Sequence, residues 1–297
     1  MRTLEFTKMH GCGNDYIYLI GEKSRPAAPG ALARRLSDRR FGIGADGLIL
    51  LTRSTAGDVR MEMYNADGSR AEMCGNGIRC AARLAFERGL ARRNPLVVET
   101  DAGLKTVSLK FDRDGRATTA TVDMGPPILD GPEIPVMAKG QVVDYSLDID
   151  GVPTKITAVS MGNPHAVVFV DDNRVFSLSD DQFAALGRKF ERHPFFPRGV
   201  NTEFVLVLGP QRLKMRVWER GSGETLACGT GACAALVAAV LTGRAQRRAT
   251  VVLRGGELDI EWSADGDLGG HVLMTGEAVE VFRGQLEVSD QELVRLG

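Results

Sequence analysis

The chain has 297 residues, of which 43% are hydrophobic and 25% are charged, so it is long enough for two domains and has the composition of a globular protein, not of a disordered chain. Lys and Arg, 37 in all, nearly balance 38 Asp and Glu, for a formal net charge of -1. Such a chain has no overall positive field to attract nucleic acid or an anionic membrane. We expect a small-molecule partner, and no nucleic-acid or membrane partner.

The chain carries no pattern of export, membrane insertion or metal binding. Its first 20 residues lack the basic start and continuous apolar core of a signal peptide. The longest uncharged apolar run, over 232–241, is about half of the roughly 20 residues that cross a bilayer. Five cysteines without CxxC spacing fit neither a disulfide framework nor a zinc ribbon, and the histidines lack metal-ligand spacing. We therefore expect a cytoplasmic enzyme with reduced thiols and no metal.

In the first half of the chain, alternating apolar and polar residues over 58–64 predict a half-buried strand. Cys74-Gly75-Asn76-Gly77 follows, and the apolar residues after it recur at helical spacing as far as Gly89, a typical helix terminator. Further strands are predicted over 97–100, 105–109 and 118–123. The Pro- and Gly-rich segment 124–135 then predicts a domain boundary.

The second half of the chain predicts the same kinds of element. Strands are expected over 155–158, 211–218, 250–253, 257–262 and 271–274. The apolar run over 232–241 has no polar face, so a helix there must be covered on every side. A last strand-like segment, 278–284, could return to either half.

Two segments 154 positions apart share one pattern, and the pattern extends beyond them. Cys74-Gly75-Asn76-Gly77 corresponds to Cys228-Gly229-Thr230-Gly231, and each precedes small apolar residues. With the two cysteines in register, Tyr64-Asn65 lies opposite Trp218-Glu219 and Gly47 opposite Asn201; a five-residue slip also brings Gly13-Asn14 opposite Gly162-Asn163. A short CGxG match alone would be weak, but several features in one order indicate a duplication.

These elements predict an α/β (α+β) fold of two pseudosymmetric halves, each a curved, mostly antiparallel or mixed β-sheet wrapped around a central helix. We expect an N-terminal half over 1–125, which carries Cys74, and a C-terminal half over 126–276, which carries Cys228. A C-terminal strand at about 277–284 would be free to return to the first half.

The two matched cysteines are the strongest candidates for chemistry. A thiol just before a helix lies beside backbone N–H groups and the positive end of the dipole, which favour its thiolate, and the same N–H groups can hold a carboxylate. We therefore take Cys74 and Cys228 as acid/base groups, whereas Cys80 and Cys233, inside the helices, and Cys12 are expected to be core residues.

Two like groups that face one carbon suit stereochemical inversion. One thiolate would remove an α-proton while the opposite thiol protonates the other face. A thiol pKa near 8.5 is far below that of an amino-acid α-carbon, so N–H groups at the helix ends would have to stabilise enolate charge in a closed cleft. No cofactor is expected.

At these residues the sequence closely resembles the diaminopimelate epimerase family. The matching stretches are KMHGCGNDYIYL, RRFGIGADGLILL, MEMYNADGSRAEMCGNGIRCAAR, SMGNPHAVVFV, GVNTEFV and VWERGSGETLACGTGACAA. The resemblance implies a cofactor-independent isomerase that interconverts LL- and meso-diaminopimelate in lysine and peptidoglycan biosynthesis and works as a homodimer. It also implies that Cys74 and Cys228 are the two catalytic residues.

The resemblance also implies a set of substrate contacts and residues that tune the thiols. The contacts are Asn14, Asn65, Gly75, Asn76, Asn163, Asn201, Glu219, Arg220, Gly229 and Thr230, and the tuning residues are His165 and Glu219. Asn amides offer donors and acceptors, Arg220 a planar fork for a distal carboxylate, and Glu219 an acceptor for ammonium. His165 could instead be a structural imidazole. Some family members have Gln where this chain has Gly47, so that side-chain contact is missing here.

Three other functions compete with this hypothesis. A related racemase for proline or hydroxyproline typically has MCGHG at the first turn, whereas this chain has MCGNG, and Asn76 with the WERG segment favours a dicarboxylic substrate. A thiol redox protein would use Cys74 and Cys228 as an exchangeable disulfide, which the lack of CxxC and the duplicated turns disfavour. A catalytically inactive amino-acid-binding module would have no need to keep both cysteines.

Overall fold

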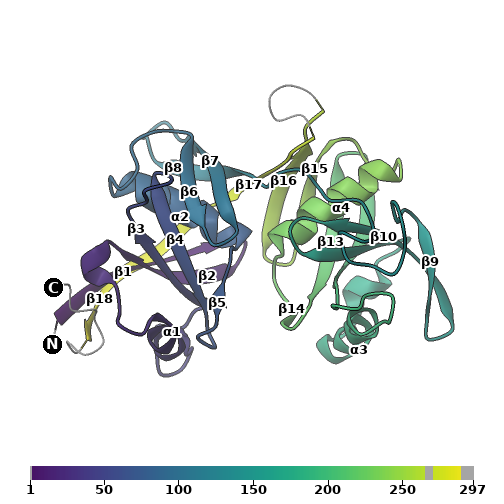
Figure 1. Cartoon of the computed structure of the whole chain (residues 1–297), viewed down its shortest axis with the longest axis horizontal. Coiled ribbons are helices and arrows are strands. Elements are labelled where there is room, and N and C mark those ends of the chain that lie inside the picture. Colours follow the sequence, from purple (N-terminus) through teal and green to yellow (C-terminus); the bar gives the residue numbers. More distant parts are fainter. Residues whose placement is uncertain (1, 265–269, 289–297) are drawn as a thin grey trace. The chain divides into compact units, whose positions relative to one another are not determined.

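The computed structural model describes residues 2–264 and 270–288, which form two compact units (Figure 1). Residues 2–122 and 276–288 belong to the first unit, and the rest of the described chain, from 123 to 275, belongs to the second. The chain therefore leaves the first unit once and returns to it with its last described strand.

The first unit is a mixed sheet with two helices. Its elements are β1 (Arg2–Gly11), β2 (Asn14–Ile20), η1 (Glu22–Ser24), α1 (Pro29–Ser37), β3 (Gly47–Thr52), β4 (Val59–Asn65), β5 (Arg70–Ala71), α2 (Gly75–Glu87), β6 (Leu96–Thr100), β7 (Gly103–Phe111), β8 (Ala117–Asp123) and β18 (Val279–Val288). The strands pair in the order β18-β1-β2-β3-β4-β6-β7-β8, with β5 also on β4. The β2–β3 and β4–β6 pairs are parallel, and the others are antiparallel.

The second unit repeats this plan. Its elements are β9 (Tyr145–Ile149), β10 (Val152–Ser160), β11 (Pro164–Val170), η2 (Arg174–Ser177), α3 (Asp180–Glu191), β12 (Asn201–Gly209), β13 (Arg212–Glu219), β14 (Gly223–Glu224), α4 (Gly229–Leu241), β15 (Arg248–Leu253), β16 (Gly256–Trp262) and β17 (Val272–Glu277). The pairing order is β9-β10-β11-β12-β13-β15-β16-β17, with β14 on β13. Its two parallel pairs, β11–β12 and β13–β15, correspond to the parallel pairs β2–β3 and β4–β6 of the first unit.

This correspondence confirms the predicted fold class. An outer helix follows β2 in the first unit and the equivalent strand β11 in the second, an inner helix follows the short strand in each, and both inner helices begin directly after a matched cysteine. β18 pairs with β1 in the first unit as β9 pairs with β10 in the second, so the returning C-terminal strand completes the first sheet.

The inner helices are surrounded by strands of their own sheets (Figure 1). α2 contacts β1, β2, β3, β4, β6 and β7, and α4 contacts β10, β11, β12, β13, β15 and β16. Every residue of α4 from Gly231 to Ala239 is buried, which explains why this helix has no polar face. α2 contains one fully buried cation, Arg79, whose guanidinium donates to the carbonyl oxygens of Gly75 at 3.1 Å and Glu277 at 3.2 Å.

Both inner helices end in the same way. Gly89 and Gly243 take positive φ angles of 71° and 69° two residues after the last helical residue, a conformation that costs glycine little. The backbone N–H of the next residue, Leu90 or Arg244, then donates back to the carbonyl of Ala85 or Ala239. Gly89 thus confirms the predicted end of the first inner helix.

The sequence analysis missed the two outer helices. α1 packs on an apolar layer that includes Leu48, Leu50 and Tyr64, and α3 packs on a layer that includes Phe204 and Trp218. α1 has nine residues and no side-chain cap, so its local signal is weak. α3 does carry a capping box, Ser179 with Gln182, which could have revealed its start.

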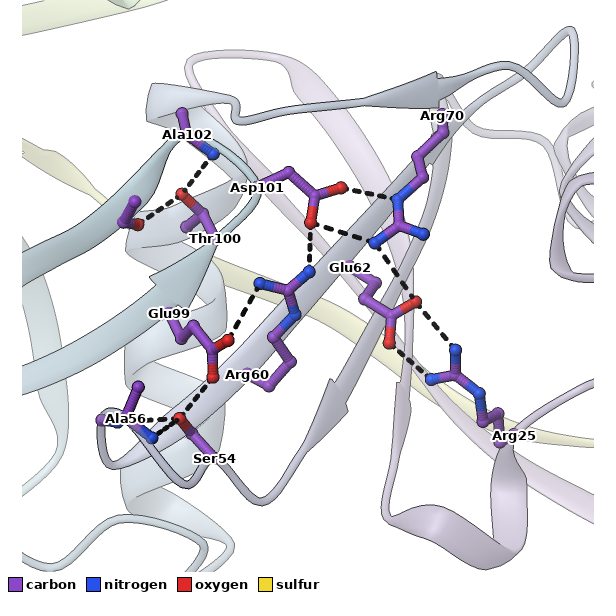
Figure 2. Close-up of polar contacts among 12 residues, drawn as sticks. Arg25, Ser54, Ala56, Arg60, Glu62, Arg70, Glu99, Thr100, Asp101 and Ala102 are labelled. Atoms are coloured by element: carbon purple, nitrogen blue, oxygen red, sulfur yellow. Dashed lines mark hydrogen bonds and ion pairs between the residues drawn. The ribbon is translucent and has the colours of Figure 1, made fainter.

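One face of β4 carries a network of charges (Figure 2). Its carboxylate Glu62 is 6% exposed and pairs with Arg25, at 2.9 Å between Nη2 and Oε2, and with Arg70 at 3.8 Å. Arg60 pairs with Asp101 and, at 3.3 Å, with Glu99. Hydrogen bonds from Arg25 lower the pKa of Glu62 and outweigh the effect of burial.

We expect Glu62→Gln to lower the free energy of unfolding by about 1–3 kcal/mol at neutral pH, because a charged hydrogen-bond acceptor is lost. A carboxyl with a lowered folded-state pKa stabilises the fold above its unfolded value and loses this contribution as pH falls through the folded pKa. The difference between wild type and variant should therefore shrink below about pH 4. Urea unfolding at several pH values measures it.

Asp150→Asn, which breaks an exposed ion pair with Lys189, is the control and should cost under about 0.5 kcal/mol. A Glu62→Gln penalty that stays the same from neutral to strongly acidic pH would show that the ion pair is not its origin.

Candidate active site

The two matched cysteines occupy the same place in their units, directly before the inner helix. Cys74 has φ -136° and ψ 123°, and its Sγ accepts the backbone N–H of Gly77 at 3.4 Å. Cys228 has φ -116° and ψ 110°, and its Sγ accepts the N–H of Gly231 at 3.3 Å. Both sulfurs therefore cap their helices as Ser or Asp commonly does, with extended backbone and a side chain that accepts from the third helical residue.

In the first unit, polar groups from β2 surround the Cys74 sulfur. The Tyr16 hydroxyl donates to Sγ at 3.6 Å, and the thiol donates to Asn14 Oδ1 at 3.3 Å. Asn76, in the first turn of α2, donates to the same Asn14 oxygen at 3.4 Å. Burial raises the pKa of Tyr16 well above its usual value, and the neighbouring Cys74 adds to this effect, so the phenol stays a neutral donor.

Asn14 is itself held by the loop that precedes β3. Asp46 accepts from Asn14 Nδ2 at 2.7 Å and from the backbone N–H of Asp15 at 3.1 Å. Arg39 donates to both Asp15 and Asp46, and Lys8 pairs with Asp15 at 2.8 Å. Burial opposes the charge of Asp15, but Arg39 and Lys8 prevail and lower its pKa. The Asn14 amide is thus oriented by a charged cluster of residues distant in sequence.

The surroundings of Cys228 are more enclosed and more acidic. Cys228 is 5% exposed, and Thr230 Oγ1 lies 3.4 Å from its sulfur. Burial raises the pKa of Cys228 well above the usual thiol value, and the carboxylates of Glu219 and Glu203 raise it further. The hydrogen bonds from Thr230 and Gly231 act in the opposite direction but do not compensate. The predicted preference of a helix N-terminus for thiolate is therefore outweighed at Cys228 in this structure.

Glu219 and His165 lie in the same part of the second unit. Burial raises the pKa of Glu219, which accepts hydrogen bonds from the Thr225 hydroxyl and the Cys228 thiol. His165 is fully buried, with Nδ1 2.7 Å from Glu203 Oε1 and Nε2 3.0 Å from Asn163 Oδ1. His165 thus links Asn163 to a buried carboxylate.

The remaining predicted residues lie at strand ends and in the helix starts. Asn201, at the start of β12, donates to the carbonyl of Pro164 at 3.0 Å and accepts the backbone N–H of Arg220 at 2.9 Å. The Arg220 side chain is exposed and donates to the carbonyl of Arg198 at 2.9 Å. Asn65 Nδ2 donates to Ser69 at 3.0 Å. Gly75 and Gly229 are the first residues of α2 and α4.

The structure brings two groups of predicted residues together, one in each unit. Cys74 meets Asn14 and Asn76 in the first, and Cys228 meets Thr230 and Glu219 in the second. Sequence reasoning missed three residues that touch these groups: Tyr16, Asp46 and Glu203. Glu203 had a visible signal, because it interrupts the apolar run of β12, and strand alternation puts Tyr16 on the same side of β2 as Asn14.

Comparison with known proteins identifies the family of this chain. The family profile described as diaminopimelate epimerase matches residues 6–129 and 157–281. The chain belongs to the diaminopimelate epimerase family. It is 50% identical over 288 residues to a diaminopimelate epimerase of Acetivibrio thermocellus, covering 97% of this chain and 100% of that protein. It is 44% identical to a diaminopimelate epimerase of Methanococcus maripaludis, over 96% of this chain and 100% of the relative.

Solved structures with the same fold share little sequence with this chain. A phenazine biosynthesis protein of the PhzF family from Bacillus anthracis matches with a TM-score of 0.70 at 15% identity, over 97% of this chain and 100% of that one. A probable proline racemase from Agrobacterium radiobacter matches with a TM-score of 0.65 at 18% identity, over 97% and 93%. These similarities show the fold alone.

The described residues contain neither a membrane-spanning helix nor a cluster of metal ligands. Between residues 2 and 264 and between 270 and 288, no helix has the length and apolar character to cross a bilayer. Within the same ranges, no three His, Cys, Asp or Glu side chains are grouped as metal ligands would be.

Gly77 and Gly231, whose N–H groups donate to the two sulfurs, should respond differently to replacement by alanine. A Cβ at Gly231 would lie 2.6 Å from Glu203 Oε1, which is held by His165 at 2.7 Å, whereas a Cβ at Gly77 would lie 2.8 Å from Cδ1 of Ile49, a methyl group that no hydrogen bond holds. We expect Gly231→Ala to cost about 1–3 kcal/mol of stability, as overpacking does, and Gly77→Ala to cost less. Chemical denaturation of both variants provides the measurement. Equal costs would contradict a rigid carboxylate beneath Gly231.

Proposed function

We propose that this protein interconverts LL- and meso-diaminopimelate by moving the α-proton between Cys74 and Cys228, without a cofactor. The observation that carries the proposal is the matched pair of thiols, each of which caps the inner helix of its own unit and accepts an N–H from its third residue. Family membership and relatives named diaminopimelate epimerase supply the substrate. The proton transfer itself follows from the chemistry of the two caps.

The proposed reaction balances with the two thiols alone. A thiolate at one cysteine takes the α-hydrogen as a proton, and the electron pair left on carbon delocalises into the substrate carboxylate. Backbone N–H groups at the starts of α2 and α4 stabilise that charge, as unpaired donors at helix N-termini do. The opposite thiol then donates its proton to the other face of the carbon. The product leaves with the protonation states of the two cysteines exchanged.

The surroundings of the sulfurs support different roles in the resting enzyme. Burial and two nearby carboxylates raise the pKa of Cys228, so we propose that Cys228 is the protonated thiol, ready to donate. Cys74 is less buried, and its sulfur accepts hydrogen bonds from the Tyr16 hydroxyl and the Gly77 N–H, two donors that favour a thiolate. We propose that it takes the first proton from the substrate.

The proposed substrate contacts divide between the reacting and distal ends of diaminopimelate. Gly75, Asn76, Gly229 and Thr230, in the first turns of α2 and α4, suit the reacting carboxylate. Asn14, Asn65, Asn163 and Asn201 offer amides to the amino and carboxylate groups. The exposed guanidinium of Arg220 suits the distal carboxylate, and Glu219, hydrogen-bonded to the Cys228 thiol, suits a tuning role beside His165.

The main alternative is a racemase of the same fold with another substrate. A hydroxyproline epimerase from Agrobacterium vitis has a TM-score of 0.65 to this chain, so fold similarity does not choose between the two. The relatives at about half identity and Asn76 in the first turn favour diaminopimelate. A redox role for the cysteines and an inactive binding module are weaker alternatives, because neither requires two identical helix caps.

Deuterium exchange tests the substrate. We expect the purified, reduced protein in D₂O to place deuterium at the α-carbon of LL-diaminopimelate while the meso isomer forms, because each product takes its new proton from a thiol that exchanges with solvent. NMR and mass spectrometry follow both events. Deuterium exchange into proline or hydroxyproline, but not into diaminopimelate, would show that the protein is a racemase for those amino acids instead.

Single-cysteine variants test the two-thiol mechanism. Cys74→Ala and Cys228→Ala should each reduce the rate of epimerisation by at least about 10²–10⁴-fold, the contribution typical of a general acid or base. Cys233→Ala, a buried cysteine within α4, is the matched control and should keep most of the activity. Circular dichroism checks that all three fold. Near-normal turnover by either cap variant would exclude the mechanism.

The proposal extends to assembly and compartment. We propose that the chain forms a homodimer, as the family resemblance implies, and works in the cytoplasm, where an odd set of cysteines without CxxC spacing stays reduced. Sedimentation velocity at micromolar concentration should give a single species of twice the 32.1 kDa chain mass. A monomer under those conditions would contradict the dimer.

A further inference from the structure

Glu203 is a buried carboxylate in a strand that is otherwise apolar. It lies on β12 with no exposed surface, and its Oε1 is 2.7 Å from Nδ1 of His165 on the neighbouring strand β11. Its other oxygen, Oε2, is also buried and has no hydrogen-bond partner among the described residues. A buried carboxylate is costly unless it is paired, and a half-satisfied one needs a reason to be retained.

Both ring nitrogens of His165 lie beside side-chain oxygen atoms. Its Nδ1 faces the Glu203 carboxylate, and its Nε2 faces Asn163 Oδ1 at 3.0 Å. Both contacts place an acceptor oxygen beside a ring nitrogen. A neutral imidazole has one N–H and can satisfy one such contact, whereas an imidazolium has two. The arrangement therefore fits a buried imidazolium–carboxylate pair that hydrogen-bonds to the Asn163 amide.

This pair lies against the cap of Cys228. A Cβ at Gly231 would be 2.6 Å from Glu203 Oε1 and 3.2 Å from the Cys228 sulfur. The Glu203 carboxylate is thus packed against the residue whose N–H donates to that sulfur. Glu219, the other carboxylate near Cys228, is influenced by both partners: His165 lowers its pKa and Glu203 raises it.

The first unit shows that the fold does not require this carboxylate. At the position equivalent to Glu203, 154 residues earlier, β3 has Ile49, whose Cδ1 lies 2.8 Å from a Cβ built at Gly77. The strand register that pairs His165 with Asn201 pairs Tyr16 with Gly47, so Tyr16 takes the place of His165. An apolar residue and a phenol therefore support the Cys74 cap, whereas a carboxylate and an imidazole support the Cys228 cap.

We propose that Glu203 is a positioning residue that keeps His165 doubly protonated and thereby orients the Asn163 amide, leaving its Nδ2 as a donor for substrate in the second unit. The chain of contacts runs from Glu203 Oε1 through both ring nitrogens of His165 to Asn163 Oδ1. An imidazolium can only donate hydrogen bonds, so a doubly protonated His165 must face the oxygen of the Asn163 amide and not its NH₂ group. The role of Glu203 in substrate binding rests on the proposed function, but its effect on the protonation of His165 does not.

Nitrogen-15 NMR of histidine-labelled protein tests the protonation state without substrate. The chain has four histidines, so a His165→Asn variant assigns the signals of His165. At about pH 7.5, both ring nitrogens of His165 should have the shifts of protonated nitrogen in wild type, whereas Glu203→Gln should leave one nitrogen unprotonated. Glu224→Gln is the matched control, because Glu224 is a half-buried carboxylate of the same unit that pairs with arginines.

A neutral His165 in wild type would overturn the proposal, and so would a Glu203→Gln variant that keeps the imidazolium. The wild-type measurement needs no substitution, so it decides the question even if Glu203→Gln does not fold. In folded Glu203→Gln, kcat/KM for diaminopimelate should fall by about 10–100-fold, as for outer partners of catalytic groups, with Glu224→Gln near wild type. Unchanged kcat/KM would overturn the substrate-orienting role, whereas failure of wild type to use diaminopimelate would overturn only the proposed function.

Discussion

The hydrogen bond from the third helical N–H to a cysteine sulfur is the interaction on which the rest of this structure depends. It requires the helix to begin directly after the thiol and the third residue to be small, and both Gly77 and Gly231 meet that requirement. Each inner helix is enclosed by its sheet: α4 because its sides are apolar, and α2 around the buried Arg79, with its first turn held beside Asn14 through Asn76. Fold and site thus share one origin in each unit.

Duplication supplied the two thiols, and divergence gave them different surroundings. The first unit supports its cap with Tyr16 and Ile49, whereas the second uses His165 and Glu203 at the same places. Charge on the outer faces has diverged too: β4 has Glu62 paired with Arg70, and β13 has Arg216 paired with Glu224, a reversal that keeps the ion pair.

Much of the architecture was predictable, and the errors have identifiable physical causes. Strand β4 and helix α4 were found because alternation and an all-apolar run are local signals. α1 was missed because a nine-residue helix without a side-chain cap depends on the apolar layer beneath it. The cluster that orients Asn14 was also missed, because Asp46 reaches it only through the parallel pairing of β2 with β3.

The sequence by itself determined the duplication, the positions of Cys74 and Cys228 before their helices, and the family, because these depend on residue order and spacing. Tertiary structure decided the environment of each sulfur. Burial and the carboxylates of Glu219 and Glu203 raise the pKa of Cys228, against the effect of its helix N-terminus. Desolvation and charge act through space, over distances set by strand pairing and packing, so no pattern along the chain could reveal which of them prevails.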